Sequence, residues 1–294
     1  MKVLITGSTG FVGTNLCNIL KENSLIEIQR VIRDISKKEV DSDLVMTEIT
    51  KESLRKNSLE QIDTIIHLAS YVHKNENHVN YEESESFKVN FQATKTLIDQ
   101  AIKCKVRRFI FLSSVGVYGD QSFKPFNISD NKHPNTFYAR SKLDAENYLI
   151  SSCKNRFMDF VILRSPLIYG KNPRGNLHDL KRLINLQLPL PFLRSINKRS
   201  LIDINVLVKI IVKSITEKRV SNGIFNVGDK NDYSTKEIIN LIAKINNQNI
   251  KFFYFPAILI KLLLIIFGKK NTIKKLFGDF QIESTEIDKI LNIH

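Results

Sequence analysis

The opening of the chain combines a short apolar strand, a glycine turn and a helix, and this combination restricts the fold more than any other feature. KVLIT (2–6) is an apolar run of strand length, rich in β-branched residues. GSTGFVG follows it, and apolar residues at 12, 16, 19 and 20 then recur at helical spacing. The sequence therefore predicts an α/β fold, a Rossmann domain with a doubly wound parallel sheet.

The three glycines of this turn predict a dinucleotide site. Gly7 permits the tight turn, Gly10 lets the backbone approach a pyrophosphate, and Gly13 allows the helix to pack on the strand. The phosphates are expected at the helix N-terminus, beside the backbone of Phe11 and Val12. The alternative is a structural turn that holds no ligand.

The residues that close the second predicted strand bear on the choice of cofactor. IEIQRVI (26–32) ends at Arg33 and Asp34. At this place an acid usually bonds the 2′-hydroxyl of the adenosine ribose, whereas an arginine accommodates a 2′-phosphate. Arg33 comes first, so NADP(H) is favoured over NAD(H). Asp34 is adjacent and keeps the opposite preference open.

A serine, a tyrosine and a lysine, in that order along the chain, suit hydride chemistry. RRFIFLSS (107–114) predicts a buried strand that carries Ser114 to the ligand edge of the sheet. Tyr138 and Lys142 follow one helical turn apart, a spacing that also arises by chance. Hydride transfer to a carbonyl leaves charge on its oxygen, so a proton donor must be in place. Tyr138 suits this role if the ammonium of Lys142 lowers the pKa of the phenol, and Ser114 would orient the carbonyl.

The composition is that of an ordinary globular protein of 294 residues, 43% hydrophobic and 25% charged. The net charge is +14, but the lysines are scattered without a helix-turn-helix or zinc pattern, so no nucleic acid is expected. The favoured interpretation is that the positive charge attracts a small doubly charged anion. Cys17, Cys104 and Cys153 are widely spaced and predict no metal site or disulfide. The first residues do not resemble a signal peptide, and a cytoplasmic location is expected.

Six motifs resemble the extended short-chain dehydrogenases/reductases that act on nucleotide sugars, which form the NAD-dependent epimerase/dehydratase family. These motifs are TGSTGFVG, HLA, VNFQAT, FLSSVGVYG, YARSK and RSPLIYG. The resemblance implies that Ser114, Tyr138 and Lys142 are catalytic, and that the last two also hold the cofactor. It adds cofactor contacts from Leu68, Ala69 and Asn90, with a capping or solvated asparagine as the alternative for the last.

The C-terminal third resembles a narrower group of reductases, which act on UDP-4-keto-6-deoxy-N-acetylhexosamines for O-antigen or capsule synthesis. The similar stretches are LPLPFLRSINKRSLIDI and FPAILIKLLLIIFGKK, and related chains continue beyond ILNIH. The resemblance implies substrate contacts from Ser114, Asn176 and Arg199, with a surface arginine as the alternative for the last, and gives Asp203 no role. Sugar 4,6-dehydratases carry an acidic pair where this chain has Val115-Gly116, so a dehydratase is disfavoured.

Two lobes and one leading reaction follow from these features. The Rossmann domain is predicted at 1–165 plus about 201–220, and a smaller C-terminal α/β lobe for the nucleotide sugar at about 166–200 plus 221–294. The leading reaction is reduction of the C4 keto group of a UDP-sugar by NAD(P)H, and the alternative is a 4-epimerase with tightly bound NAD. A nucleotide-sensing protein without catalysis is disfavoured because both Tyr138 and Lys142 are present.

The apolar run within 252–270 raises the question of membrane contact. Pro256 and Lys261 interrupt it, and a spanning helix needs about 20 apolar residues. The favoured interpretation is a helix that closes the core of the small lobe or an interface. The alternative is a peripheral helix on the inner face of a membrane, with Lys269 and Lys270 at the headgroups. A homodimer through helices near 87–104 and 138–153 is expected by analogy alone.

Overall fold

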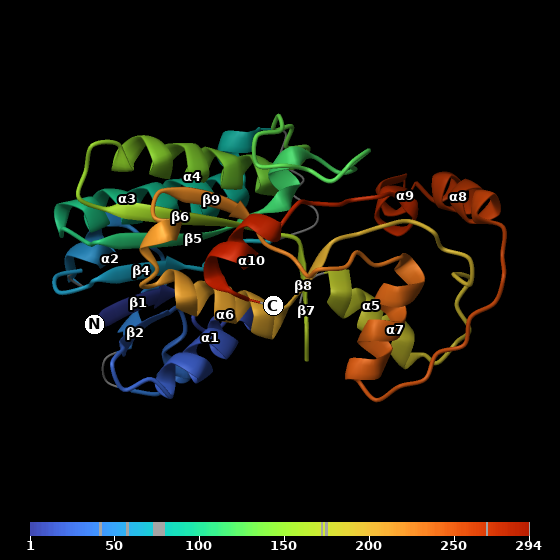
Figure 1. Cartoon of the computed structure of the whole chain (residues 1–294), viewed down its shortest axis with the longest axis horizontal. Helices are drawn as coiled ribbons and strands as arrows, with labels where there is room; N and C mark the ends of the chain where they lie inside the picture. The colour runs from blue at the N-terminus through green and yellow to red at the C-terminus, as the bar shows by residue number, and fades with distance from the viewer. Residues whose placement is uncertain are drawn as a thin grey trace.

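A parallel sheet forms the larger part of the molecule (Figure 1). The computed structural model describes residues 1–40, 43–56, 59–72, 80–171, 173, 176–268 and 270–293, without the side chains of 55, 56, 176, 270 and 271. Within these residues, seven strands pair in the order β3-β2-β1-β4-β5-β6-β9. They are β1 (Lys2–Thr6), β2 (Glu27–Ile32), β3 (Leu44–Val45), β4 (Thr64–His67), β5 (Arg108–Ser114), β6 (Asp159–Ser165) and β9 (Gly223–Asn226). The predicted doubly wound Rossmann fold is confirmed.

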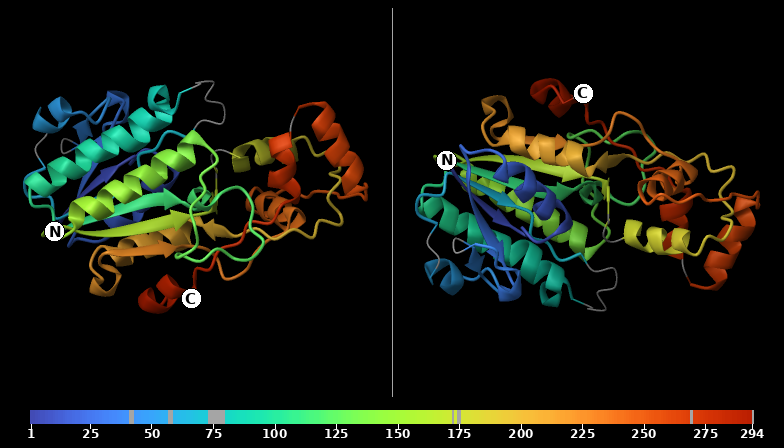
Figure 2. Two further views of the ribbon diagram at one scale, coloured as in Figure 1. Left: turned by 90° about the horizontal axis from the view of Figure 1, so that it is seen from above. Right: turned by 90° about the horizontal axis from the view of Figure 1, so that it is seen from below.

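Helices cover both faces of this sheet (Figure 2). On one face lie α3 (Ala93–Lys103) and α4 (Phe137–Cys153), and on the other lie α1 (Phe11–Lys21) and α6 (Ile204–Ser214). The short helix α2 (Lys51–Lys56) packs beside α3. Contact between α3 and α4 places the two segments expected to pair two copies of the chain side by side, and the homodimer stays a prediction.

Burial on both faces explains why the central strands are apolar throughout. Val3 and Ile5 of β1 point into the core beneath α1 and α6, whereas Leu4 points into the core beneath α3 and α4. All three side chains are fully buried. Parallel strands between two helical layers require such continuous apolar runs, and this is why KVLIT predicted the architecture so well.

The helix predicted near 87–105 begins with a different winding. Its first part is a π-helical segment, η3 (Ser86–Gln92), which continues directly into α3. Asn90 lies in this segment and is fully buried. The remaining short elements are the 3-10 helices η1 (Ile35–Lys37), η2 (Tyr81–Glu83), η4 (Val115–Tyr118) and η5 (Lys218–Val220).

The smaller lobe has its own two-stranded sheet and its own apolar core. Its elements are β7 (Leu167–Tyr169), β8 (Leu201–Asp203), α5 (Asn176–Asn185), α7 (Thr235–Ile245), α8 (Ala257–Ile266) and α9 (Lys270–Phe277). A capping box opens α7: Glu237 N–H donates to Ser234 Oγ, and Ser234 N–H donates to a carboxylate oxygen of Glu237.

Two predicted lobe boundaries differ from the structure. β9 pairs with β6 and completes the main sheet, and α10 (Thr285–Leu291) packs against α6 and β9. Both were assigned to the small lobe. Conversely, β8 pairs with β7 in the small sheet, although residues from 201 were assigned to the Rossmann domain. Local sequence patterns do not identify a strand's pairing partner, because that partner lies far away along the chain.

The apolar run after Phe252 also differs from its favoured interpretation. It forms α8, in which no residue is buried, so this helix does not close the core of the small lobe. Among the residues that the structure describes, no helix is both long enough and apolar enough to cross a bilayer. The structure describes neither the position of Lys269 nor the side chain of Lys270, the two residues expected at the headgroups.

Candidate active site

The glycine turn leaves no space for side chains. Gly7 has φ +69°, and a Cβ there would lie 2.6 Å from the amide nitrogen of Ala69. A Cβ on Gly13 would lie 2.2 Å from the carbonyl oxygen of Gly7. Gly10 is the N-cap of α1 and offers no side chain, so the N–H groups of the first helical turn, at Phe11 and Val12, face the space above the turn. This cradle fits the pyrophosphate of a dinucleotide.

The end of β4 lies directly against this turn. The amide of Leu68 donates to the carbonyl of Thr6, and that of Ala69 donates to the Thr6 hydroxyl, at 3.2 and 3.3 Å. Leu68 is half-buried against the core under α1. The structure therefore brings Leu68 and Ala69 beside the glycines, as the motif HLA implied.

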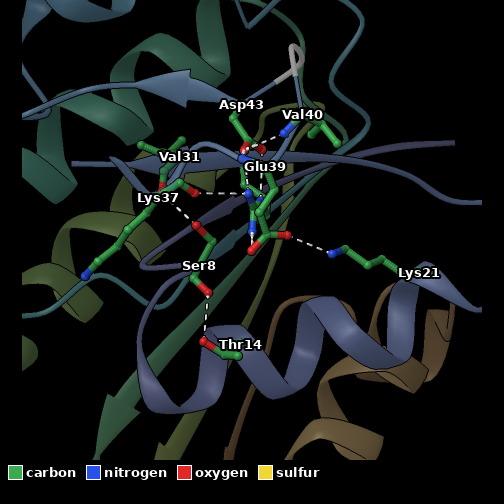
Figure 3. Close-up of polar contacts among 9 residues, drawn as sticks. Ser8, Thr14, Lys21, Val31, Lys37, Glu39, Val40 and Asp43 are labelled. Carbon is green, nitrogen blue, oxygen red and sulfur yellow. Dashed lines mark hydrogen bonds and ion pairs between the residues drawn. The ribbon is translucent and has the colours of Figure 1, made fainter. Parts of the chain in front are cut away.

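The adenosine end of the site contains one arginine that carboxylates already surround. Nε of Arg30 donates to Asp43 at 2.9 Å, a second nitrogen pairs with the other oxygen of that carboxylate, and Nη1 lies 2.9 Å from Glu39. Glu39 also pairs with Lys21 at 2.9 Å. Figure 3 shows these carboxylates close to Ser8, whose Oγ donates to the Val31 carbonyl. The charge of Arg30 is therefore compensated within the protein.

Arg33 and Asp34 stand at the exposed end of β2 and differ in their surroundings. The Asp34 carboxylate caps η1 by accepting from the amide and hydroxyl of Ser36, at 3.0 and 2.7 Å. These bonds lower the pKa of Asp34. Arg33 is exposed immediately before it. A carboxylate committed to capping is less suited to a ribose, so the arrangement favours Arg33 at this position.

Asn90 binds the loop after β4 to the helical layer. Its Oδ1 accepts from the amide of Tyr71 at 2.7 Å and from Ser70 Oγ at 3.2 Å. Its Nδ2 donates to the Tyr71 carbonyl at 3.0 Å and to Ser141 Oγ at 3.1 Å. The amide is thus fully engaged by protein groups. Asn90 positions the residues around the site, and a direct contact with the cofactor stays a prediction.

A buried histidine beside this loop was not predicted. His67 Nδ1 lies 2.6 Å from Thr6 Oγ1, and Nε2 lies 2.8 Å from Thr94 Oγ1. Thr94 uses its hydroxyl proton on the Asn90 carbonyl, so Nε2 is the protonated nitrogen. Burial lowers the pKa of His67 to about 3, and it stays neutral at ordinary pH. Its role is to connect β1, β4 and α3.

The predicted catalytic pair of Ser114 and Tyr138 meets at the carboxyl end of β5. The side chains of Ser114 and Ser70 lie beside the Tyr138 phenol and act on it as hydrogen-bonding groups that lower its pKa, against the larger effect of burial. Ser114 Oγ also accepts from the amide of Gly116 at 3.1 Å, which fixes the serine at the start of η4. Thr136 caps α4 through the amide of Ala139 and so places Tyr138 in its first turn. Ser70 was not predicted, although it follows β4 at the same sheet edge.

Lys142 does not play the electrostatic role predicted for it. Its Nζ donates to the Leu112 carbonyl at 3.0 Å and lies 4.7 Å from the centre of the Phe111 ring. Burial lowers the pKa of Lys142 to about 7, against the opposing effect of the Glu146 carboxylate. Burial also raises the pKa of Tyr138. The expected lowering of the tyrosine pKa is wrong here, because desolvation acts on both groups and is the largest effect.

Replacing Lys142 with Met is expected to abolish turnover and yet to raise the free energy of unfolding. The folded pKa lies below the lysine value of 10.5, so the buried charge destabilises the fold fully below about pH 7 and less as pH rises. We expect a gain of about 2 kcal/mol near pH 6 that narrows towards pH 10. Urea unfolding at several pH values measures this gain, and a gain independent of pH would contradict the buried-charge explanation.

A buried ion pair supports the catalytic helix one turn beyond Lys142. Glu146 and Arg164 pair through two guanidinium nitrogens, at 2.6 to 3.2 Å, and both are buried. Ser113 donates to the same carboxylate, which explains why Ser113 faces away from the site and Ser114 towards it. Arg164 Nη1 donates to Tyr118 OH at 2.7 Å. The sequence signal that could have indicated a charged group behind Lys142 is Glu146, four residues later on the same helix.

Of the two residues expected to bind the sugar nucleotide, the structure describes the side chain of Arg199 but not that of Asn176. Arg199 is half-buried, and its Nη1 donates to the carbonyls of Gly278 and Lys274, at 3.2 and 3.4 Å. It therefore holds the C-terminal end of α9, and contact with a diphosphate stays a prediction. Asn176 is the first residue of α5, but its side chain lies outside the description.

In the described ranges, no group of three or more His, Cys, Asp or Glu side chains is arranged to hold a metal ion. Cys17 and Cys153 are buried thiols, and Cys104 is half-buried. Burial raises the pKa of Cys17 and of Cys153 to about 11, so both are poor ligands and poor nucleophiles near neutral pH.

Comparison with known proteins agrees with this geometry. The chain is 33% identical to a UDP-glucose 4-epimerase of Vibrio cholerae, over 98% of this chain and 89% of that one. It is 28% identical to a dTDP-4-dehydro-6-deoxyglucose reductase of Escherichia coli, over 86% and 85%. A UDP-glucuronic acid 4-epimerase of Bacillus cereus, solved in complex with NAD, shares the fold with a TM-score of 0.77 at 20% identity, over 100% and 93%.

The match to a family model covers most of the chain. The model describes the NAD dependent epimerase/dehydratase family and matches residues 3–228. That span contains the glycine turn, the strand that ends at Ser114, and the helix of Tyr138 and Lys142. The chain belongs to the NAD dependent epimerase/dehydratase family.

Proposed function

We propose that this chain moves a hydride between a nicotinamide dinucleotide and C4 of a UDP-sugar. The observation that carries the proposal is that the Ser114 side chain lies beside the Tyr138 phenol as a hydrogen-bonding group, at the edge of the sheet where α/β proteins bind ligands. The relatives from Vibrio cholerae and Escherichia coli support a sugar nucleotide as substrate.

The chain's own residues would divide the work at the sugar oxygen. The bound dinucleotide supplies or accepts the hydride. Ser114 donates a hydrogen bond to O4 and holds the sugar in register, and Tyr138 gives its proton to O4 as the ketone becomes an alcohol. In the reverse direction the phenolate takes that proton back. Lys142, whose side chain is buried between α4 and β5, would bind the nicotinamide ribose.

The net reaction that we favour is reduction of a UDP-4-keto-6-deoxy-N-acetylhexosamine by NADPH. Arg33 supports it, because an exposed arginine after β2 suits the 2′-phosphate of a reductant that comes and goes. The second candidate is a 4-epimerase, which the Vibrio cholerae relative favours. An epimerase would oxidise C4 and return the hydride to the other face, so its NAD would stay bound.

Arg33 offers a test of the cofactor preference. Replacing Arg33 with Ala is expected to raise the KM for NADPH about 10- to 100-fold, because one charge-assisted contact to the 2′-phosphate is lost. The KM for NADH should change little. Lys37→Ala removes a charge nearby in η1 and is the matched control. An equal effect on both cofactors, or an equal effect of the control, would contradict the assignment.

A substrate panel distinguishes the two candidates. The purified protein is incubated with UDP-hexoses, UDP-N-acetylhexosamines and UDP-4-keto-6-deoxy-N-acetylhexosamine, with NADPH, with NADH and with no added cofactor. Consumption of NADPH in proportion to the keto sugar supports the reductase. Interconversion of C4 epimers without net consumption, identified by NMR, supports the epimerase. If no UDP-sugar reacts under any condition, the proposal is wrong.

A further inference from the structure

The helix α8 is the most exposed apolar element in the described part of the molecule. Figures 1 and 2 place it at the outer end of the small lobe, beyond the main sheet and beside α9. Its contact with the protein is restricted to one narrow stripe, because only Ile260 and Leu264, one turn apart, are half-buried. Exposed leucines and isoleucines occupy most of the rest, namely Ile258, Leu259, Leu262, Leu263, Ile265 and Ile266.

These six side chains span about 160° of the helix circumference at 100° a residue, and with Ile260 and Leu264 the apolar arc reaches about 260°. A helix that packs on a globular core buries one apolar stripe and keeps the other side polar. Three exposed aromatic residues, Phe253, Tyr254 and Phe255, extend the same surface just before the helix, and Phe267 extends it just after. A contiguous patch of this kind marks an interaction site.

The charge around the patch indicates the nature of the partner. Residues 238–278 contain seven lysines and no aspartate or glutamate, although the whole chain has 30 acidic residues. Lys275 is exposed on α9. The ammonium of Lys261, on α8, lies 5.4 Å above the ring of Phe277, on α9. The side chain of Arg194 lies over the Tyr254 ring at 4.8 Å. Lys274 of α9 is paired with Asp120 at 3.5 Å, whereas Lys261, Lys275 and Arg194 are exposed cations beside the apolar surface. An apolar surface bordered by such cations complements a bilayer that contains anionic lipid.

We propose that residues 253–267 form a docking surface for an anionic membrane, which holds the small lobe at the lipid headgroups. The apolar side chains of α8 enter the acyl boundary, and Lys261, Lys275 and Arg194 contact the phosphates. Docking through the outer end of the lobe leaves the main sheet away from the bilayer.

Flotation of the full-length protein with lipid vesicles tests this surface. The vesicles are phosphatidylcholine alone or phosphatidylcholine with about one-third phosphatidylglycerol. We expect binding to the mixed vesicles and weaker binding to the neutral ones, with a decrease as salt is added. The double variant Ile266→Glu with Phe267→Glu should lose about tenfold or more of the bound fraction. These two side chains are 76% and 72% exposed, so the fold should not depend on them.

The matched control is Leu25→Glu with Phe157→Glu, two side chains of the Rossmann domain that are 79% and 74% exposed. It adds the same charge and should bind as the wild type does, and circular dichroism confirms that both variants are folded. No binding by the wild type, or an equal loss in the control, overturns the proposal. So does a dimer, seen by sedimentation without lipid, that only the α8 variant dissociates, because α8 would then be a protein interface.

Discussion

Replacing Tyr138 with Phe is expected to lower kcat by about 10²- to 10⁴-fold, the range that a positioned general acid contributes. The ring stays in place, and only the hydroxyl beside Ser114 and Ser70 is lost. Burial raises the pKa of this phenol, so it carries its proton at neutral pH and suits a donor more than a ready base. Binding of the dinucleotide should survive, because the glycine turn is untouched.

The control for this experiment lies on the same helix. Tyr148→Phe removes a hydroxyl that donates to Asp99 at 2.5 Å, on the part of α4 that faces α3. It should leave kcat within about twofold of the wild type. Single-turnover kinetics with the best UDP-sugar and titration with NADPH separate chemistry from binding. Turnover of Tyr138→Phe at a rate close to that of Tyr148→Phe would show that the phenol is not the proton donor.

Replacing Arg164 with Leu is expected to destabilise the protein by about 3–5 kcal/mol. Glu146 would remain buried with its charge uncompensated, and the Tyr118 hydroxyl would lose its donor. The double variant with Glu146→Gln should recover much of the loss, because it removes the stranded charge. The same variants should also alter catalysis, since Glu146 opposes the fall of the Lys142 pKa.

An exposed ion pair provides the comparison for this loss. Arg219 pairs with Glu217 at 2.8 Å on the surface, and Arg219→Leu should destabilise the protein far less than Arg164→Leu, because solvent screens an exposed pair. Urea unfolding of five proteins, namely the wild type, Arg164→Leu, Glu146→Gln, their double variant and Arg219→Leu, gives both values and the coupling energy between Glu146 and Arg164. Equal costs for the two arginine variants would mean that burial of the Glu146–Arg164 pair has no energetic consequence.

Much of the fold was predictable because its signals are local. The strand, turn and helix at residues 2–21 follow from apolar spacing and three glycines, and the helix of Tyr138 follows from its pattern and its cap at Thr136. The place of β9 in the main sheet was not predictable, because GIFNVG carries no information about its partner β6. The π-helical start before α3 was missed for a similar reason, since Asn90 is held there by Tyr71 and Ser141.

The candidate site shows the same division between local pattern and tertiary environment. The order of Ser114, Tyr138 and Lys142 predicted which side chains meet, and the structure brings the first two into contact. The sign of the pKa changes was not predictable, because it depends on how completely water is excluded from Tyr138 and Lys142. Exposure of α8 was equally inaccessible, since an apolar helix in sequence looks the same whether it lies inside a core or outside it.

The repeated passage of the chain between the lobes has a mechanical consequence. The backbone crosses from β6 to β7, from β8 to α6, from β9 into the segment before α7, and from the small lobe back to α10. Several covalent connections therefore join the two lobes in parallel, and any movement of one lobe relative to the other must bend them together. A fragment that stops at residue 228 would lack α10 and leave Ile211 and neighbouring apolar side chains of α6 without part of their cover. Neither lobe is thus a separable module, and opening for substrate exchange should be a small, concerted movement.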